Sequence, residues 1–169
     1  MPLPAERAEL SGEQGLLLRQ DLPEPLRQEL EWGSRQLLKA TPAALVVLLW
    51  QDQCLLRRGL LQSGSDSAPL GGSPFAPGPI CQQALQRQRS IHLVDLRLYP
   101  GREEFTALLP GLPSVLVQPV GSAGLLVVGG WSARCFGNAD QAWIEGWAER
   151  LRDEWLLDPN GPGDETPAA

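Results

Sequence analysis

The feature that most constrains the fold of this chain is an unbroken apolar run, Ala43–Trp50, with the sequence AALVVLLW. A strand with one face in water alternates apolar and polar residues, whereas this run presents apolar side chains to both faces. We therefore expect a strand at the centre of a sheet that is covered on both sides. The run is also far shorter than the roughly 20 residues that a membrane-spanning helix needs.

The patterns on either side of this run predict an α+β domain. The further expected elements are a helix over 23–40, a strand over 54–61, a short helix from Pro79, a strand over 91–98, a hairpin over 114–131 and a helix that begins near Asn138. An antiparallel sheet with the two long helices on one face satisfies this order. Periodicity places four residues in the helix–sheet core: Leu30, Leu37, Ile144 and Leu151.

Length and composition predict one folded domain with loose ends. The 169 residues are 43% hydrophobic, which suits a single core. We expect residues 1–20 to form a flexible arm, residues 21–157 the domain, and residues 158–169 a disordered tail. The segment 62–79 is rich in Gly, Pro and Ser, and we expect a mobile loop there.

The charge and the cysteines limit the partners and the compartment. The net charge is −6, whereas a nucleic-acid-binding protein needs a basic surface. The N-terminus has no apolar core of a signal peptide. Cys54, Cys81 and Cys135 form no CxxC pair and are odd in number, which disfavours a disulfide framework or a zinc site. We expect a soluble cytoplasmic protein that binds no nucleic acid.

The nucleophilic and titratable residues form no catalytic or metal-binding pattern. His92 is the only histidine, so there is no triad with a serine or a cysteine, and no glycine-rich phosphate-binding loop is present. A lone histidine on a strand is more typical of a packed residue than of a ligand. Cys135 has apolar neighbours, which favours a buried structural thiol over a haem ligand. We expect no enzyme activity and no metal site.

The stretch VDLRLYPGREEF, Val94–Phe105, is the candidate recognition edge. It starts with strand-like alternation, turns at Pro100-Gly101 and runs into three charges. A rigid aromatic and a planar cation are favoured where proteins bind one another. The candidate binding residues are Arg57, Arg58, Tyr99, Arg102 and Glu104. The alternative is a solvated loop in which Tyr99 only closes the core.

Two expectations follow for these candidates. Arg57 and Arg58 are adjacent in a strand and face opposite sides, so at most one of them points into a pocket. Replacement of Arg102 and Glu104 together is expected to change the free energy of unfolding by less than about 0.5 kcal/mol, as for surface sites.

Several stretches resemble known families. The segment from Leu26 to Trp155 is similar to a GAF domain, the small ligand-binding and dimerising module of signalling proteins. The similar stretches are PICQQALQRQRSIHLVDL, VLVQPVG with GLLVVGG, and the closing set Ser132, Arg134, Phe136 and Asp140. More narrowly, LLRRGLL, PICQQAL, LVDLRLYPGREEF, VLVQPVG and SARCFGNADQAWI resemble the cyanobacterial and plastid family that is named for the cofactor assembly of complex C. Both resemblances imply a GAF-like sheet with the N- and C-terminal helices packed on one face.

The narrower resemblance implies a function. That family is implicated in attaching the covalent haem to cytochrome b on the stromal or cytoplasmic side of the cytochrome b6f complex. It implies a non-catalytic assembly factor whose partners are apocytochrome or other assembly-factor subunits, with haem as a transient cargo. It also implies a place at the cytoplasmic face of the thylakoid membrane. Members usually carry membrane spans, so membrane association here would come through partners or through a span missing from this chain.

The broader resemblance leaves an alternative open. A GAF-type small-molecule sensor or dimerisation module would have the same fold. Its pocket would lie between the sheet and the 62–79 loop.

Overall fold

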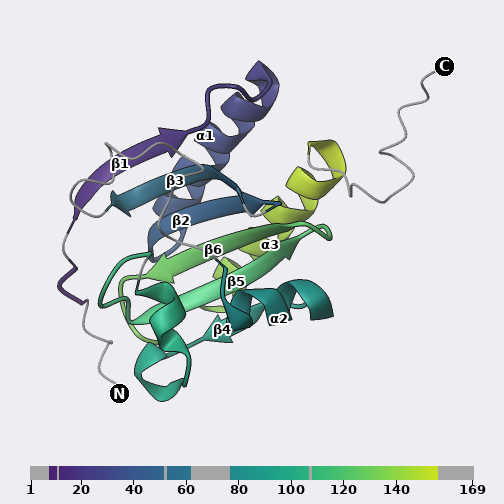
Figure 1. Cartoon of the computed structure of the whole chain (residues 1–169). Coiled ribbons are helices and arrows are strands. Elements are labelled where there is room, and N and C mark those ends of the chain that lie inside the picture. The colour runs from purple at the N-terminus through teal and green to yellow at the C-terminus, as the bar shows by residue number, and fades with distance from the viewer. Residues whose placement is uncertain (1–7, 11, 52, 62–76, 107, 156–169) are drawn as a thin grey trace.

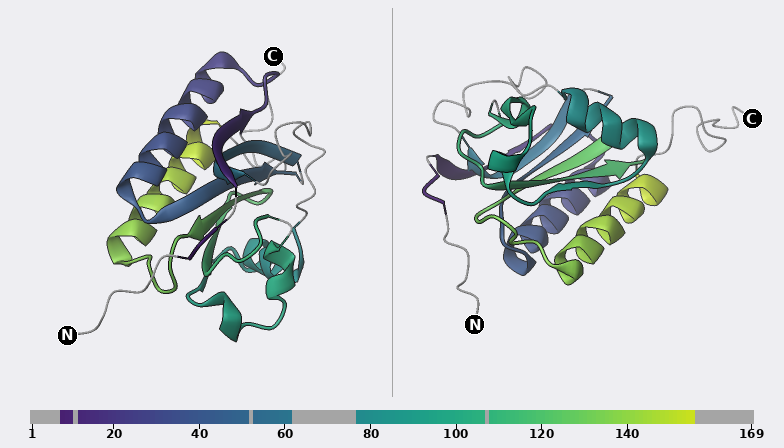
Figure 2. Two further views of the ribbon diagram at one scale, coloured as in Figure 1. Left: turned by 90° about the vertical axis from the view of Figure 1, so that its left-hand side faces the viewer. Right: turned by 90° about the horizontal axis from the view of Figure 1, so that it is seen from below.

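In the computed structural model, which describes residues 8–10, 12–51, 53–61, 77–106 and 108–155, the chain forms a six-stranded antiparallel sheet with helices on both faces (Figures 1 and 2). The strands are β1 (Glu13–Leu18), β2 (Ala43–Trp50), β3 (Gln53–Leu61), β4 (Ile91–Leu93), β5 (Ser114–Val120) and β6 (Gly124–Gly130), in the spatial order β1-β3-β2-β6-β5-β4. The helices are α1 (Glu24–Ala40), α2 (Pro79–Arg87) and α3 (Asn138–Glu154), with short 3-10 helices η2 (Leu96–Leu98) and η3 (Arg102–Phe105).

The strand β2 lies inside the sheet, between β3 and β6, and is buried on both faces as its composition predicts. Val46 and Leu48 pack in the core beneath α1 and α3. Val47 and Leu49 pack in the core on the opposite face. The alternation of an extended chain therefore supplies apolar side chains to two layers at once.

The helices α1 and α3 pack side by side on one face of the sheet, which confirms the α+β expectation (Figure 2). The four residues predicted for this core, Leu30, Leu37, Ile144 and Leu151, are all fully buried. The helices approach closely at Gly33, where a methyl group would overlap the indole of Trp147. That indole donates to Glu29 Oε2 at 3.1 Å, and Arg150 Nε donates to the same oxygen at 2.9 Å.

The opposite face of the sheet is covered by α2, η2, η3 and the chain that joins them (Figure 2). The core of this face includes Cys54, Cys81 and Phe105, all buried. Burial raises the pKa of the Cys54 thiol to about 11. Burial, and then the neighbouring Glu104, raise the pKa of the Cys81 thiol as well. Both thiols are therefore protonated at neutral pH and pack as small apolar groups.

The expectation of a flexible arm over residues 1–20 is wrong for residues 13–18. These form β1, which pairs antiparallel with β3 and places Gly15 opposite Gly59. The strand is half-exposed along most of its length, so its apolar pattern in the sequence is weak. The edge of β3 is nevertheless available, and pairing satisfies the backbone groups of both strands.

The expected strand over 91–98 is also corrected, because only Ile91–Leu93 pair with β5. The chain then leaves the sheet at Asp95, whose side chain accepts a hydrogen bond from the Arg97 backbone and starts η2. As a result Leu98, which strand alternation would bury, is exposed.

The remaining expectations concern the hairpin, the short helix, the loop and the tail. The hairpin of β5 and β6 and the short helix from Pro79 are confirmed. The expected tail over 158–169 and most of the expected loop over 62–79 lie outside the described residues. Within the described part, no helix has the length and the apolar character needed to cross a membrane.

Candidate functional site

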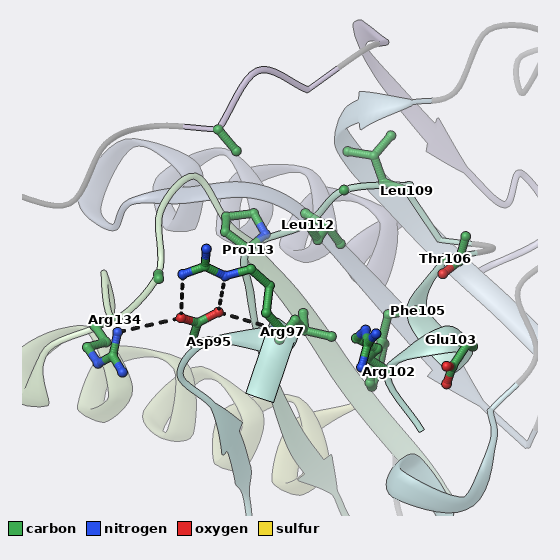
Figure 3. Close-up of a pocket in the computed structure, with 14 residues that line it drawn as sticks. Asp95, Arg97, Arg102, Glu103, Phe105, Thr106, Leu109, Leu112, Pro113 and Arg134 are labelled. Atoms are coloured by element: carbon green, nitrogen blue, oxygen red, sulfur yellow. Dashed lines mark hydrogen bonds and ion pairs between the residues drawn. The ribbon is translucent and has the colours of Figure 1, made fainter. Parts of the chain in front are cut away.

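A pocket of about 880 Å³ opens beside the chain segment that follows β4, on the face of the sheet that α2 covers (Figure 3). Its walls come from residues 95–97, 102–113 and 133–134, with Ala8 at one side. The apolar lining residues include Leu96, Phe105, Leu109 and Leu112, and the charged ones are Asp95, Arg97, Arg102, Glu103 and Arg134. Segments distant in sequence thus meet at one site.

Asp95 is the buried acid of this pocket, with only 3% of its surface exposed. Arg97 binds it with a two-pronged contact, Nε to Oδ1 at 3.0 Å and Nη2 to Oδ2 at 2.9 Å. The Arg97 backbone N–H also donates to Oδ1, at 3.2 Å. The side-chain hydrogen bond from Arg97 is the main reason that the pKa of Asp95 lies below its ordinary value. Charge-assisted, bidentate pairs of this kind fix the geometry of both partners.

Arg134 approaches the same carboxylate from a different segment, with Nη1 3.6 Å from Asp95 Oδ2 (Figure 3). Its backbone has φ 56°, in the left-handed region that residues other than glycine rarely adopt. The Arg134 N–H donates to the Val94 carbonyl at 2.7 Å. A backbone conformation that costs energy is held here by its surroundings, and such positions gather at functional sites.

The exposed rim of the pocket is mainly cationic. The side chains of Arg97 and Arg134 are 84% and 62% exposed, and Arg102 is exposed too. Glu103 is the exposed acid among the residues that line the pocket. This local excess of positive charge contrasts with the net charge of −6 of the whole chain.

The structure places Arg57 and Arg58 away from this pocket, on opposite faces of β3. Arg57 is buried on the α2 face, and its Nη2 donates to the Leu108 carbonyl at 3.0 Å. Burial lowers its pKa. Arg58 points to the other face, and its Nη1 donates to the Glu31 carbonyl at 2.9 Å. The opposite orientations agree with the expectation from strand alternation, and a role of either arginine in partner binding stays a prediction.

The structure brings Arg102 to the pocket but gives its two candidate neighbours other contacts. Arg102 lines the pocket and donates from Nη1 to the Tyr99 carbonyl at 3.4 Å. Tyr99 is half-buried and packs against the core on the α2 face, as the solvated-loop alternative predicted. A binding role for Tyr99 stays a prediction.

Glu104 has a structural role that the sequence did not reveal. Its carboxylate accepts backbone hydrogen bonds from Gly78 at 2.9 Å, Ile80 at 2.9 Å and Cys81 at 3.0 Å, all at the start of α2. The expectation that Glu104 is a surface residue with little effect on stability is therefore wrong. In the 3-10 turn of η3, Glu103 faces the solvent while Glu104 turns inward, because neighbouring residues of a helix lie on different sides.

His92 and Cys135 occupy packed positions. His92 is half-buried, lies edge-to-face with Phe136 at 5.8 Å between ring centroids, and has a pKa lowered by burial. The Cys135 thiol lies 3.6 Å from Ser114 Oγ, in a half-buried position. Among the described residues, no group of three acidic, histidine or cysteine side chains is placed to hold a metal ion. The sensor pocket expected beside the 62–79 loop lies outside the described residues and stays a prediction.

Three residues of the site, Asp95, Arg97 and Arg134, were not among the predicted binding residues. The signal that could have identified the first two is the spacing Asp-x-Arg directly after a strand, where an aspartate commonly bonds the backbone two residues on. Arg134 could have been noted from its place between the last strand and the last helix. Its convergence on Asp95 depends on the fold.

Solved structures with the same fold were found by comparison. A type II free methionine-R-sulfoxide reductase from Thermoplasma acidophilum is similar with a TM-score of 0.56 and 17% identity, covering 76% of this chain and 89% of that chain. The GAF domain of a phosphoenolpyruvate-protein phosphotransferase from Coxiella burnetii is similar with a TM-score of 0.55 and 20% identity, covering 73% and 78%. At these identities the likeness shows the fold alone, and it confirms the GAF fold expected from the sequence.

A sequence relative and a family model show the family. The relative is the chloroplastic cofactor assembly of complex C protein CCB4 of Arabidopsis thaliana, 29% identical over 138 residues. The match covers 80% of this chain and 46% of that protein, so the chain spans about half the length of the relative. The family model matches residues 1–151. The chain, with its GAF fold and its arginine-rimmed pocket, therefore belongs to the CCB2/CCB4 family of cofactor assembly of complex C.

Proposed function

We propose that this protein is a non-catalytic factor in covalent haem attachment to the cytochrome b subunit of the cytochrome b6f complex, and that it contacts its partners at the pocket rim. Membership of a cofactor-assembly family supports the general role. The observation that carries the specific proposal is the place of Val94–Phe105. This stretch, by which the sequence most resembles the family, supplies Asp95, Arg97 and Arg102 to the pocket.

The chemistry of the described residues supports a role without catalysis. Burial keeps the thiols of Cys54 and Cys81 protonated, so neither supplies a thiolate nucleophile. His92 packs against Phe136 and has a lowered pKa. One of the proteins with the same fold is a reductase, so the fold by itself does not decide the matter. The charged groups of the pocket pair with one another, which suits recognition of a surface.

The proposed partners are apocytochrome or other assembly-factor subunits, with haem as a transient cargo. The proposed place is the cytoplasmic face of the thylakoid membrane, reached through those partners or through a span missing from this chain. The name of the Arabidopsis relative, which is chloroplastic, supports a photosynthetic setting.

A complementation assay tests this proposal. A strain that lacks the gene receives the wild-type chain or the double variant Arg102→Ala/Arg134→Ala, and covalent haem on the cytochrome is scored by haem staining. We expect the double variant to melt close to the wild type and to fail in haem attachment. The matched control is Arg35→Ala, which removes an exposed arginine from α1 on the other face of the sheet. Full haem attachment by a stable double variant would reject the pocket rim as the contact surface.

A further inference from the structure

The arrangement of charges in the pocket indicates the chemistry of its occupant. We propose that the pocket takes a short acidic and apolar segment of a partner polypeptide, with its carboxylates on Arg97, Arg134 and Arg102. The inference rests on the proposed function, because it assumes that the partner is a protein. It adds to that function the kind of segment that is recognised.

The pair of Arg97 and Arg134 is arranged before any partner arrives. Asp95 engages Nε and Nη2 of Arg97. A guanidinium carries five N–H donors, so within the described part of the chain three donors of Arg97 remain for another acceptor. Arg134 is fixed through its backbone bond to Val94 and its approach to Asp95. Exposed arginines usually lose side-chain freedom when they bind, and here Asp95 has already removed much of it.

The charge balance of the pocket favours an anion with few charges. Three arginines line the pocket together with two acids, Asp95 and Glu103. One net positive charge attracts a carboxylate, while the acids oppose a polyanion such as nucleic acid. Elsewhere acidic residues outnumber basic ones, since the chain has 20 of the former and 14 of the latter. An acidic segment is therefore repelled by most of the surface and attracted at this site, which steers it to one place.

The apolar lining favours a polypeptide segment over a small anion. Leu109 and Leu112 lie along one wall, with Arg134 and Arg97 toward one end and Arg102 and Glu103 toward the other (Figure 3). A free carboxylate or phosphate ion would occupy one end and leave the apolar wall in water. An extended segment with acidic residues at separated positions and apolar residues between them pairs with both ends and covers the wall, which adds hydrophobic stabilisation.

Fluorescence anisotropy with a defined probe tests this inference. The purified chain is titrated into a fluorescein-labelled peptide of alternating leucine and glutamate, and into a matched peptide with glutamine for glutamate. We expect binding of the glutamate peptide, weakened by added salt, and at least roughly tenfold weaker binding of the glutamine peptide. Arg97→Ala, Arg134→Ala and Arg102→Glu are each expected to weaken binding roughly tenfold or more, because charge-assisted hydrogen bonds are lost. Arg35→Ala is the matched control and is expected to bind as the wild type does.

The outcomes that overturn the inference are distinct. Equal binding of both peptides would show that only apolar contact matters, and full competition by inorganic phosphate would show that the site takes an anion alone. Because Arg97 and Arg134 also hold Asp95, unfolding of those variants would move the decision to Arg102→Glu, since the Arg102 side chain bonds a carbonyl of its own turn. Unchanged binding by folded Arg102→Glu would reject the inference.

The same variants separate this inference from the proposed function. Loss of haem attachment without any peptide binding would keep the contact surface and reject the acidic segment. Peptide binding with full haem attachment by Arg102→Ala/Arg134→Ala would reject the proposed function alone.

Discussion

Asp95 carries three consequences of one side chain. It ends β4 by offering the Arg97 backbone an acceptor other than a neighbouring strand, as short polar side chains commonly do. It fixes the Arg97 guanidinium in an exposed position. It also draws Arg134 toward the same point from the far end of the domain. The position of the arginine pair is therefore decided by a residue that is itself out of the solvent.

The pKa of Asp95 leads to a prediction about acid stability. Since the Arg97 hydrogen bond lowers this pKa in the folded protein, the ionised carboxylate favours folding. Its contribution is fully present above the unfolded pKa, about 3.9, and is lost as the pH falls through the lower folded value. We expect Asp95→Asn to be less stable than the wild type at neutral pH and to lose less stability on acidification. Urea unfolding at a series of pH values from about 2 to 6 measures both slopes. Equal slopes would show that Asp95 ionisation does not stabilise the fold.

At the scale of elements, Glu104 joins η3 to α2. The first backbone N–H groups of a helix have no partner within the helix, and this carboxylate accepts three such groups near the start of α2. An anion is also favoured at that end by the helix dipole. The wall of the pocket and the cover of the α2-side core are therefore held together by one residue.

We expect Glu104→Ala to lower the free energy of unfolding by about 1–2 kcal/mol, as the loss of a helix N-cap does. Glu103→Ala, one residue earlier and exposed, is the matched control and is expected to change it by less than about 0.5 kcal/mol. Thermal or urea unfolding measures both. The Cys81 thiol, which lies beside Glu104, is expected to react faster with a thiol reagent in Glu104→Ala than in the control. Equal stabilities of the two variants would mean that the cap contributes nothing.

The elements that the sequence predicted are those with long or unmistakable patterns. The run Ala43–Trp50 can only be a doubly covered strand, and the stripes of α1 and α3 extend over several turns. The strand β1 was missed because it is short and half-exposed. Alternation over Val94–Leu98 suggested a strand because the pattern does not show that the Asp95 side chain competes for the backbone. The arginine pair could not be predicted, since it needs Arg134 to be brought to Asp95 by the fold.

At the scale of the whole molecule, one sheet serves two cores. Val46 and Leu48 of β2 pack under α1 and α3, and Val47 and Leu49 pack under α2 and η3. Because the same strand holds both layers, neither core has a sheet of its own. The two faces are expected to unfold together as one cooperative unit.

Leu151→Ala tests this coupling. Leu151 is fully buried between α3 and the sheet, and its truncation is expected to cost about 2–5 kcal/mol, as for other large-to-small core changes. We expect the same loss on the α2 face, although Leu151 does not touch it. Tryptophan fluorescence reports mainly on the α3 face, and labelling of Cys81 reports on the other. Both denaturation midpoints should fall together, and a Cys81 midpoint that stays at the wild-type value would show two independent units.

The strand order also sets the order of events in time. The pairs β2–β3 and β5–β6 join neighbours in sequence, so each closes a short loop and forms quickly. The pair β2–β6 joins the two halves of the domain, with Leu48 opposite Leu126. Closing that long loop costs the most chain entropy before any contact offsets it, so it limits the folding rate. The apolar run that dictates the architecture is therefore also where the chain spends its search, and substitutions there would act on the rate of folding as well as on stability.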